Sequence, residues 1–85
     1  MLYEITDTRN PRMIDKWETT IEATTGRKAI DKYLENRGEH FNIENTSNRD
    51  VIWKVTPFYE RDGKKYLAGR ISWYGIKPII TTVND

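Results

Sequence analysis

The sequence predicts an α+β fold: a twisted antiparallel sheet of four to five strands with one helix packed on one face, in the order β-β-α-β-β-β. Three observations support this fold class. Only one segment has a clear helical pattern, the C-terminal half holds two β-rich runs joined by a Gly-containing turn, and 85 residues suit a single α+β domain over residues 1–85. We expect the core to rely on aromatic side chains, because only 36% of the chain is hydrophobic.

The first strand is predicted over Leu2–Thr6, where apolar and polar side chains alternate. Residues 11–24 allow two interpretations, because their apolar side chains fit both the period of a strand and that of a helix. The consecutive β-branched residues Thr19, Thr20 and Ile21 favour the strand. We therefore predict a second strand here and keep the helix as the alternative.

A helix is predicted over Arg27–Arg37, the segment with the clearest helical period. Its apolar stripe consists of Ala29, Ile30, Tyr33 and Leu34. Thr24 or Thr25 is placed to cap the N-terminus, and Gly38 is placed to end the helix in the left-handed conformation. A short strand over residues 41–43 is predicted to follow.

Two further strands, Val51–Tyr59 and Lys65–Tyr74, are predicted to form a hairpin, and the turn between them decides which side chains share a face. A two-residue Asp62-Gly63 loop would distribute the apolar residues over both faces. A three-residue loop that also includes Arg61, with Gly63 left-handed beside a bulge, gathers them on one face instead, so we predict the three-residue loop. The apolar face would then carry Val51, Trp53, Val55, Leu67, Ile71 and Trp73.

This apolar face is predicted to form the core with the helix, and Trp17 and Ile21 are expected to extend it. Pro57 and Gly69 lie nearly opposite each other and predict a bend in the hairpin, because proline cannot donate a ladder hydrogen bond. A last strand is predicted over Ile79–Val83. Its open edge could pair with a partner or with a second copy, so the chain is expected to be a monomer or an edge-strand homodimer.

The other face of the hairpin, together with its basic tip, is the predicted binding surface. It carries Lys54, Phe58, Arg61, Lys64, Lys65, Tyr66, Arg70 and Tyr74. Such residues also occur as ordinary cross-strand pairs, but aromatic and Arg side chains are typical anchors of protein interfaces. We therefore expect a small binding protein, an inhibitor, adaptor or regulator, that docks on a larger protein. Single-stranded nucleic acid is the alternative partner, because flat rings and cations also suit its bases and phosphates.

A winged helix-turn-helix protein that binds DNA is a further alternative. It requires residues 11–24 to be helical, Gly26 to lie in the turn and Arg27–Arg37 to be the recognition helix. Asp31 and Glu35 weaken this interpretation, because they place negative charge on the side that would face DNA.

The residues offer no recognisable catalytic set, cofactor cradle or metal-ligand cluster, so we expect a protein that is not an enzyme and has no cofactor. His40 is the only histidine, and Glu39 is its one neighbouring candidate for acid–base chemistry. Gly26, Arg27 and Lys28 could hold a phosphate at the helix start, but the glycine spacing of a P-loop is missing.

The net charge of +1 conceals an uneven distribution. Residues 1–50 hold eight Lys/Arg and ten Asp/Glu, whereas residues 51–85 hold six and three. The absence of cysteine, of a leader pattern and of a long apolar run predicts a cytoplasmic protein with no membrane partner. Abundant Ile, Lys, Asn and Tyr with only three Ala are typical of AT-rich genes, which favours a low-GC microbe, a phage or a mobile element.

Overall fold

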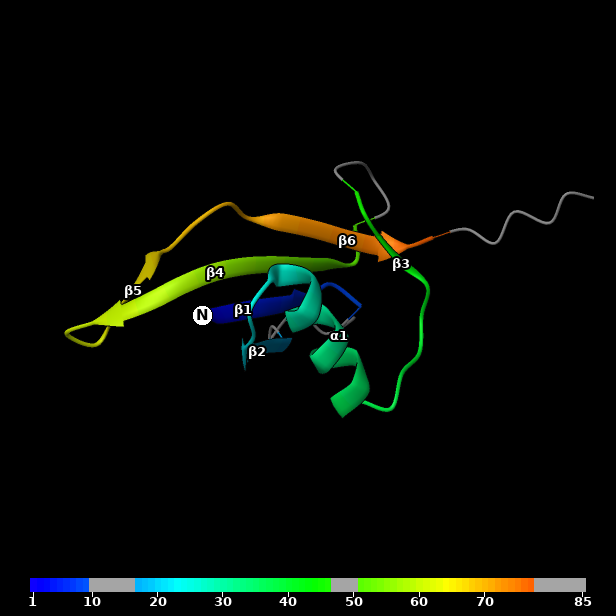
Figure 1. The fold of residues 1–85 in the computed structure, drawn as a ribbon, viewed down its shortest axis with the longest axis horizontal. Coiled ribbons are helices and arrows are strands. Elements are labelled where there is room, and N and C mark those ends of the chain that lie inside the picture. The colour runs from blue at the N-terminus through cyan, green and yellow to red at the C-terminus, as the bar shows by residue number, and fades with distance from the viewer. Residues whose placement is uncertain (10–16, 47–50, 78–85) are drawn as a thin grey trace, which may run out of the picture.

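The computed structural model describes residues 1–9, 17–46 and 51–77, which form one helix and a six-stranded sheet (Figure 1). In chain order the elements are β1 (Leu2–Asp7), β2 (Trp17–Glu22), α1 (Gly26–Asn36), β3 (Ile43–Asn45), β4 (Trp53–Arg61), β5 (Lys64–Leu67) and β6 (Ser72–Ile76). All pairs are antiparallel, in the order β2-β1-β4-β6-β3, with β5 paired to β4. The predicted α+β fold is confirmed, with six strands in place of four to five.

Helix α1 begins and ends as the sequence predicts. The Thr25 side chain caps its N-terminus by accepting a hydrogen bond from the Lys28 backbone N–H at 3.1 Å. Gly38 follows the helix with a φ of 69°, the left-handed conformation that glycine adopts most readily. The predicted apolar stripe is buried and consists of Ala29, Ile30, Tyr33 and Leu34.

Residues 17–22 form strand β2, which pairs along its whole length with β1. The predicted strand is confirmed for this part of the segment, and the helical interpretation is wrong for it. The winged helix-turn-helix alternative is therefore wrong as well, because it requires a helix here. Residues 10–16 and the predicted strand Ile79–Val83 lie outside the described residues. The short strand predicted at 41–43 is β3, which begins at Ile43.

The core lies between α1 and one face of the sheet. Its largest fully buried side chains are Trp53, Ile5, Ile30 and Val55, from the two central strands and the helix. Ile21 joins the core as predicted, whereas the Trp17 side chain is not among the described ones. The helix therefore covers only the face of the sheet to which the odd-numbered residues of β1 and β4 point.

The turn between β4 and β5 has two residues, so the predicted three-residue loop is wrong. Arg61 pairs with Lys64, and Asp62 and Gly63 between them have φ values of 54° and 75°. Two successive positive φ values define a type I′ turn, whose twist matches that of the flanking strands. Odd residues of β4 consequently pair with even residues of β5.

Further from the turn, the register shifts by two residues. Phe58 pairs with Leu67, and Val55 pairs with Ser72. A distance of three residues along β4 therefore corresponds to five residues along the segment that runs from β5 to β6. The pairing is interrupted opposite Pro57. The Pro57 carbonyl accepts a hydrogen bond from the Ala68 N–H at 2.9 Å, but proline has no N–H with which to donate one. The predicted bend at Pro57 and Gly69 is confirmed. Because the shift is an even number, the assignment of faces stays the same in β6.

This register moves part of the predicted core to the opposite side of the sheet. Leu67 pairs with Phe58 and Trp73 with Lys54, so both lie on the face away from the helix, 60% and 38% exposed. Ile71 lies in the connection between β5 and β6 and is half-buried. The prediction failed because it assumed that apolar residues mark a single face, whereas this hairpin carries them on both.

Trp53 and Trp73 should therefore differ in their contributions to stability. We expect Trp53→Ala to lower the free energy of unfolding by about 3–5 kcal/mol, because a fully buried side chain is lost. Trp73→Ala should lower it by about 1–2 kcal/mol at most, because Trp73 is already partly exposed. Urea unfolding of both variants tests this, and equal losses would contradict the faces assigned here.

Candidate interaction surface

The end of the β4–β5 hairpin projects from the rest of the sheet (Figure 1). Strand β1 accompanies β4 only as far as the pair Leu2–Phe58, whereas β4 continues to Arg61. We call residues 59–67, which comprise the end of β4, the turn and β5, the hairpin arm. Its strands pair with each other, so the arm offers both of its faces and the outer edge of β5 as a surface.

Two tyrosines lie side by side on one face of the hairpin arm. Tyr59 and Tyr66 are cross-strand partners, and their rings are stacked with centroids 5.4 Å apart and planes at 21°. They are 49% and 41% exposed. Stacking holds the two rings in one orientation, so they form a firm aromatic patch.

The other face of the hairpin arm begins at Phe58, which is buried although it lies away from the helix. Lys65 covers it, with Nζ 4.9 Å from the ring centroid and 2.9 Å from Glu4 Oε2. Leu67 continues this face and is largely exposed. A hollow of about 170 Å³ opens here, lined by Glu4, Thr56, Phe58, Lys65, Tyr66 and Leu67.

The predicted binding residues fall into two groups. Arg61, Lys64, Lys65 and Tyr66 belong to the hairpin arm, and Phe58 lies at its base. Lys54 is half-buried near the start of β4, and Arg70 is exposed in the connection to β6.

Tyr74 was predicted on the binding face, but it pairs with Trp53 and is buried on the helix side. The register is the cause, because even residues of β6 share a face with odd residues of β4. The same register brings Tyr59 onto the surface beside Tyr66, a contact that sequence reasoning missed. The signal was the Asp-Gly pair itself, the strongest local indication of a two-residue turn.

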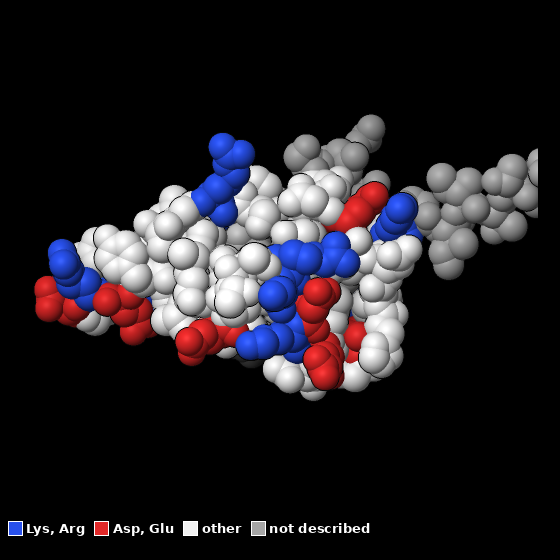
Figure 2. Space-filling model, viewed as in Figure 1, with Lys and Arg blue, Asp and Glu red and all other residues white. Residues whose placement is uncertain are grey.

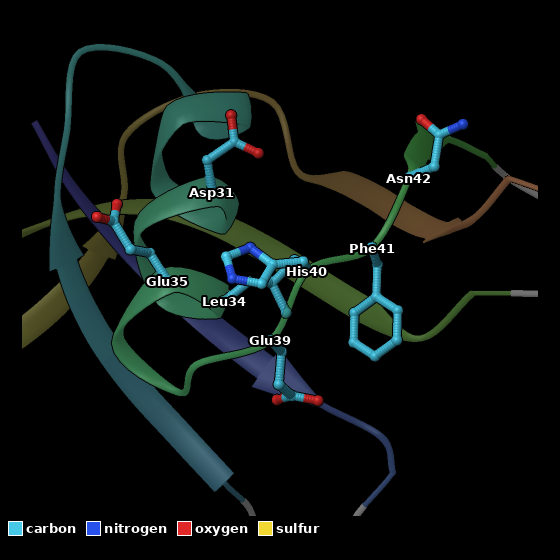
Figure 3. Close-up of a pocket in the computed structure, with 7 residues that line it drawn as sticks. All are labelled: Asp31, Leu34, Glu35, Glu39, His40, Phe41 and Asn42. Carbon is cyan, nitrogen blue, oxygen red and sulfur yellow. The ribbon is translucent and has the colours of Figure 1, made fainter.

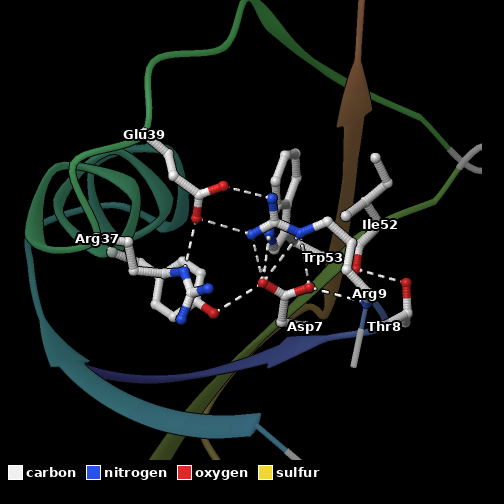
Figure 4. Close-up of polar contacts among 8 residues, drawn as sticks. Asp7, Thr8, Arg9, Arg37, Glu39, Ile52 and Trp53 are labelled. Carbon is white, nitrogen blue, oxygen red and sulfur yellow. Dashed lines mark hydrogen bonds and ion pairs between the residues drawn. The ribbon is translucent and has the colours of Figure 1, made fainter. Parts of the chain in front are cut away.

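An ion-pair network joins the end of β1 to the end of α1 (Figure 4). The Asp7 carboxylate is fully buried and accepts hydrogen bonds from the Tyr33 hydroxyl at 2.8 Å and the Trp53 indole N–H at 3.2 Å. Arg9 Nη2 lies 2.7 Å from Asp7 Oδ2, and Arg9 Nη1 lies 2.6 Å from Glu39 Oε2. No buried side-chain N or O of the described residues lacks a hydrogen-bond partner.

Arg9 also lies over two aromatic rings. Its guanidinium carbon is 5.1 Å from the Trp53 ring centroid and 5.6 Å from that of Phe41. A planar guanidinium can bind carboxylates along its edge while it stacks on rings with its face. The Arg9 side chain is therefore engaged within the domain on both its edge and its face.

The network shifts the pKa values of its members. Burial alone raises the pKa of Asp7, but hydrogen bonds from Arg9 and Tyr33 outweigh it and lower this pKa to about 2. Hydrogen bonds from Arg9 and then Arg37 lower the pKa of Glu39 to about 2. Burial and the hydrogen bond to Asp7 raise the pKa of Tyr33 to about 12. Both carboxylates and both guanidinium groups are thus ionised at neutral pH.

The role of this network is structural, and sequence reasoning missed it. Asp7 continues the alternation of Tyr3 and Ile5 and so points toward the core. The sequence did contain one signal of the network: a charged residue at a core-facing position of a strand, because a buried carboxylate requires hydrogen-bond or ion-pair partners. The partner Glu39 is 30 residues away from Arg9 along the chain, and no local pattern connects them.

An open hollow of about 650 Å³ lies beside the C-terminal end of α1 (Figure 3). It is lined by Asp31, Leu34, Glu35, Glu39, His40, Phe41 and Asn42. Figure 3 shows the carboxylates of Asp31, Glu35 and Glu39 pointing away from the His40 ring. Glu39 is paired with Arg9 and Arg37, so the His40–Glu39 pair considered from the sequence is not assembled. No cluster of three or more His, Cys, Asp or Glu in the described ranges could hold a metal ion.

At the start of α1, the Arg27 side chain contacts other residues of the domain. Its Nε lies 3.4 Å from Asp31 Oδ1, and its Nη1 donates to the Ile43 carbonyl at 3.3 Å. The Lys28 backbone N–H is used by the Thr25 cap. The arrangement is that of a capped helix end.

Acid should destabilise the domain through the two carboxyl groups of the network. Their folded pKa of about 2 is below the ordinary values of 3.8 and 4.5, so their stabilisation is complete above about pH 5 and is lost as the pH falls toward about 2. In urea unfolding over this range, Asp7→Asn should lose less stability with acid than the parent. Asp31→Asn, at an exposed pair, is the matched control and should follow the parent. An Asp7→Asn slope equal to the parent's would contradict this role.

Arg9 should not be replaceable by lysine. We expect Arg9→Lys to lower the free energy of unfolding by about 2–3 kcal/mol at neutral pH, because an ammonium group cannot bind Asp7 and Glu39 at once while stacking on Trp53. Arg27→Lys is the control, and its exposed pair should contribute less than about 0.5 kcal/mol. Similar losses in the two variants would mean that the network adds little to stability.

Comparison with protein-family models, with curated proteins and with solved structures finds no match to this chain. Over the ranges that the structure describes, no helix is long and apolar enough to cross a membrane. The function therefore has to be inferred from the surfaces of the domain itself. The ion-pair network is engaged internally, whereas the aromatic and aliphatic side chains of the hairpin arm face outward.

Proposed function

We propose that the domain is a non-enzymatic binding protein, an inhibitor, adaptor or regulator, that docks on a larger protein through its hairpin arm. One observation carries the proposal: Tyr59 and Tyr66 are 49% and 41% exposed and lie side by side on one face of an element that projects from the sheet, with Leu67 60% exposed on its other face. Exposed aromatic residues that form a patch are the usual anchors of protein interfaces.

The anchoring of the hairpin arm supports this proposal. Its strand β4 is the central strand of the sheet and continues directly from the fully buried Trp53 and Val55. The tyrosines are therefore mounted on an element that is continuous with the core, and their stacking already orders both rings. Anchors that are already ordered reduce the entropic cost of association.

Single-stranded nucleic acid is the second candidate partner. The observation that favours it is charge, because residues 64–77 contain Lys64, Lys65, Arg70 and Lys77 but no Asp or Glu. The stacking of Tyr59 on Tyr66 speaks against it, because each ring already uses one face. Net charge of +1 also provides little general attraction for phosphates.

We further propose that the protein acts in the cytoplasm of a low-GC microbe or belongs to one of its phages or mobile elements. The support is compositional: no cysteine, and a residue usage typical of AT-rich genes. A small domain that blocks or redirects a host protein would need only one binding surface, and the exposed patch on the hairpin arm could serve as one.

Affinity capture with paired variants tests the proposal. The immobilised parent should retain a protein from a low-GC bacterial lysate that the double variant Tyr59→Ala/Tyr66→Ala fails to retain, because the aromatic anchors are gone. Ile76→Ala, an exposed apolar residue on β6, is the control and should retain it. Circular dichroism should show both variants folded.

Two results would contradict the proposal. One is a captured set that is the same for the parent and the tyrosine variant. The other is binding of short single-stranded oligonucleotides at low salt that falls steeply as salt is added, which would favour the nucleic-acid candidate instead.

A further inference from the structure

We infer that the outer edge of β5 binds an extended acidic segment of the partner by strand addition. This inference rests on the proposed function, and it adds the chemistry of the segment that the hairpin arm would recognise. An exposed strand edge, the absence of negative charge along it and an apolar side chain beside it carry the inference together.

The backbone of β5 has a free edge. In a two-residue hairpin the residues that flank the turn form a hydrogen-bonded pair, and such pairs then alternate along the strands. Arg61–Lys64 and Tyr59–Tyr66 are therefore the pairs whose backbone groups are hydrogen-bonded between β4 and β5. The hydrogen bond from the Ala68 N–H to the Pro57 carbonyl continues this alternation. Lys65 and Leu67 belong to the pairs that are not hydrogen-bonded, so their backbone N–H and C=O groups point away from β4, toward the free edge of β5. Within the described ranges, β5 pairs with no strand other than β4.

The charge along this edge is of one sign. Residues 64–70, which comprise β5 and the start of the connection to β6, carry three cations and no carboxylate. Lys64 and Arg70 are exposed, and no described carboxylate forms a salt bridge with either of them. In Figure 2 the border above β5 and the connection to β6 is white and blue, whereas red atoms gather at the tip of the hairpin arm and along the lower border. A strand added at this edge would meet positive charge.

Charge complementarity therefore selects the occupant. A second copy of this chain, added through its own β5, would place Lys64 and Lys65 opposite equivalent lysines, and like charges across a strand pair are destabilising. An acidic segment would instead pair with Lys64 and Arg70. Leu67, 60% exposed next to this edge, provides a contact for an apolar residue that alternates with the acidic ones.

Selection from a library of random linear peptides by the full chain tests the inference. We expect the enriched peptides to alternate Asp or Glu with apolar residues. A selected peptide should bind Lys64→Glu/Arg70→Glu at least about tenfold more weakly than the parent, because two attractive contacts become repulsive. Lys28→Glu/Lys77→Glu makes the same change in net charge away from the hairpin arm and should bind within about twofold of the parent.

Backbone pairing has its own test. Methylating alternate backbone nitrogens of the selected peptide, in the frame that faces β5, should abolish binding, whereas methylating the other frame should leave it within about threefold of the unmodified peptide. Enriched peptides without an acidic excess, equal loss in the two charge-reversed variants, or tolerance of methylation in both frames would each overturn the inference.

The outcomes also separate this inference from the proposed function. Peptides that lose binding to Tyr59→Ala/Tyr66→Ala but are neutral or basic would overturn the acidic partner and leave the hairpin arm as a docking surface. Enrichment of polyanions without regard to sequence, including oligonucleotides used as competitors, would favour nucleic acid and overturn both. Peptides bound independently of the hairpin arm would also count against both.

Discussion

The Asp62-Gly63 turn is the constraint on which the arrangement of this domain depends. Two residues with positive φ join Arg61 directly to its partner Lys64, and this fixes odd residues of β4 against even residues of β5. Since Trp53 and Val55 face the helix, Leu67 faces away from it. The same turn thus determines which side chains β5 exposes on each face of the hairpin arm.

A second constraint holds the other end of the molecule. Asp7, Arg9 and Glu39 connect β1 to the segment after α1, and Trp53 and Tyr33 donate hydrogen bonds to the same buried carboxylate. The charged groups of this network contact one another, so the network stabilises the helix-covered half of the domain. The hairpin arm lies at the opposite end of β4, where exposed side chains can make contacts without disturbing the core.

Local patterns in the sequence predicted the fold class, the helix with Thr25 and Gly38 at its ends, and strands β1 and β2, because each is encoded within a few neighbouring residues. The faces of the hairpin could not be predicted from hydrophobicity, since Phe58, Leu67 and Trp73 are apolar on the side away from the helix. About half of the candidate surface was therefore identified, through Arg61, Lys64, Lys65 and Tyr66, while Tyr59 and Leu67 required the observed register. The ion-pair network depends on contacts between distant segments and has no local pattern.

The most direct test of this account is the register of the hairpin in solution. In an antiparallel pair, residues that are opposite but not hydrogen-bonded have Cα atoms about 4.5 Å apart, which brings their Hα atoms into close contact. Nuclear Overhauser spectra should show strong Hα–Hα contacts for Glu60 with Lys65 and for Phe58 with Leu67. A strong Hα–Hα contact of Tyr59 with Lys65 instead would indicate the three-residue loop, because that pair is then opposite but not hydrogen-bonded. It would return Leu67 and Trp73 to the face of Trp53 and contradict the surface described for the hairpin arm.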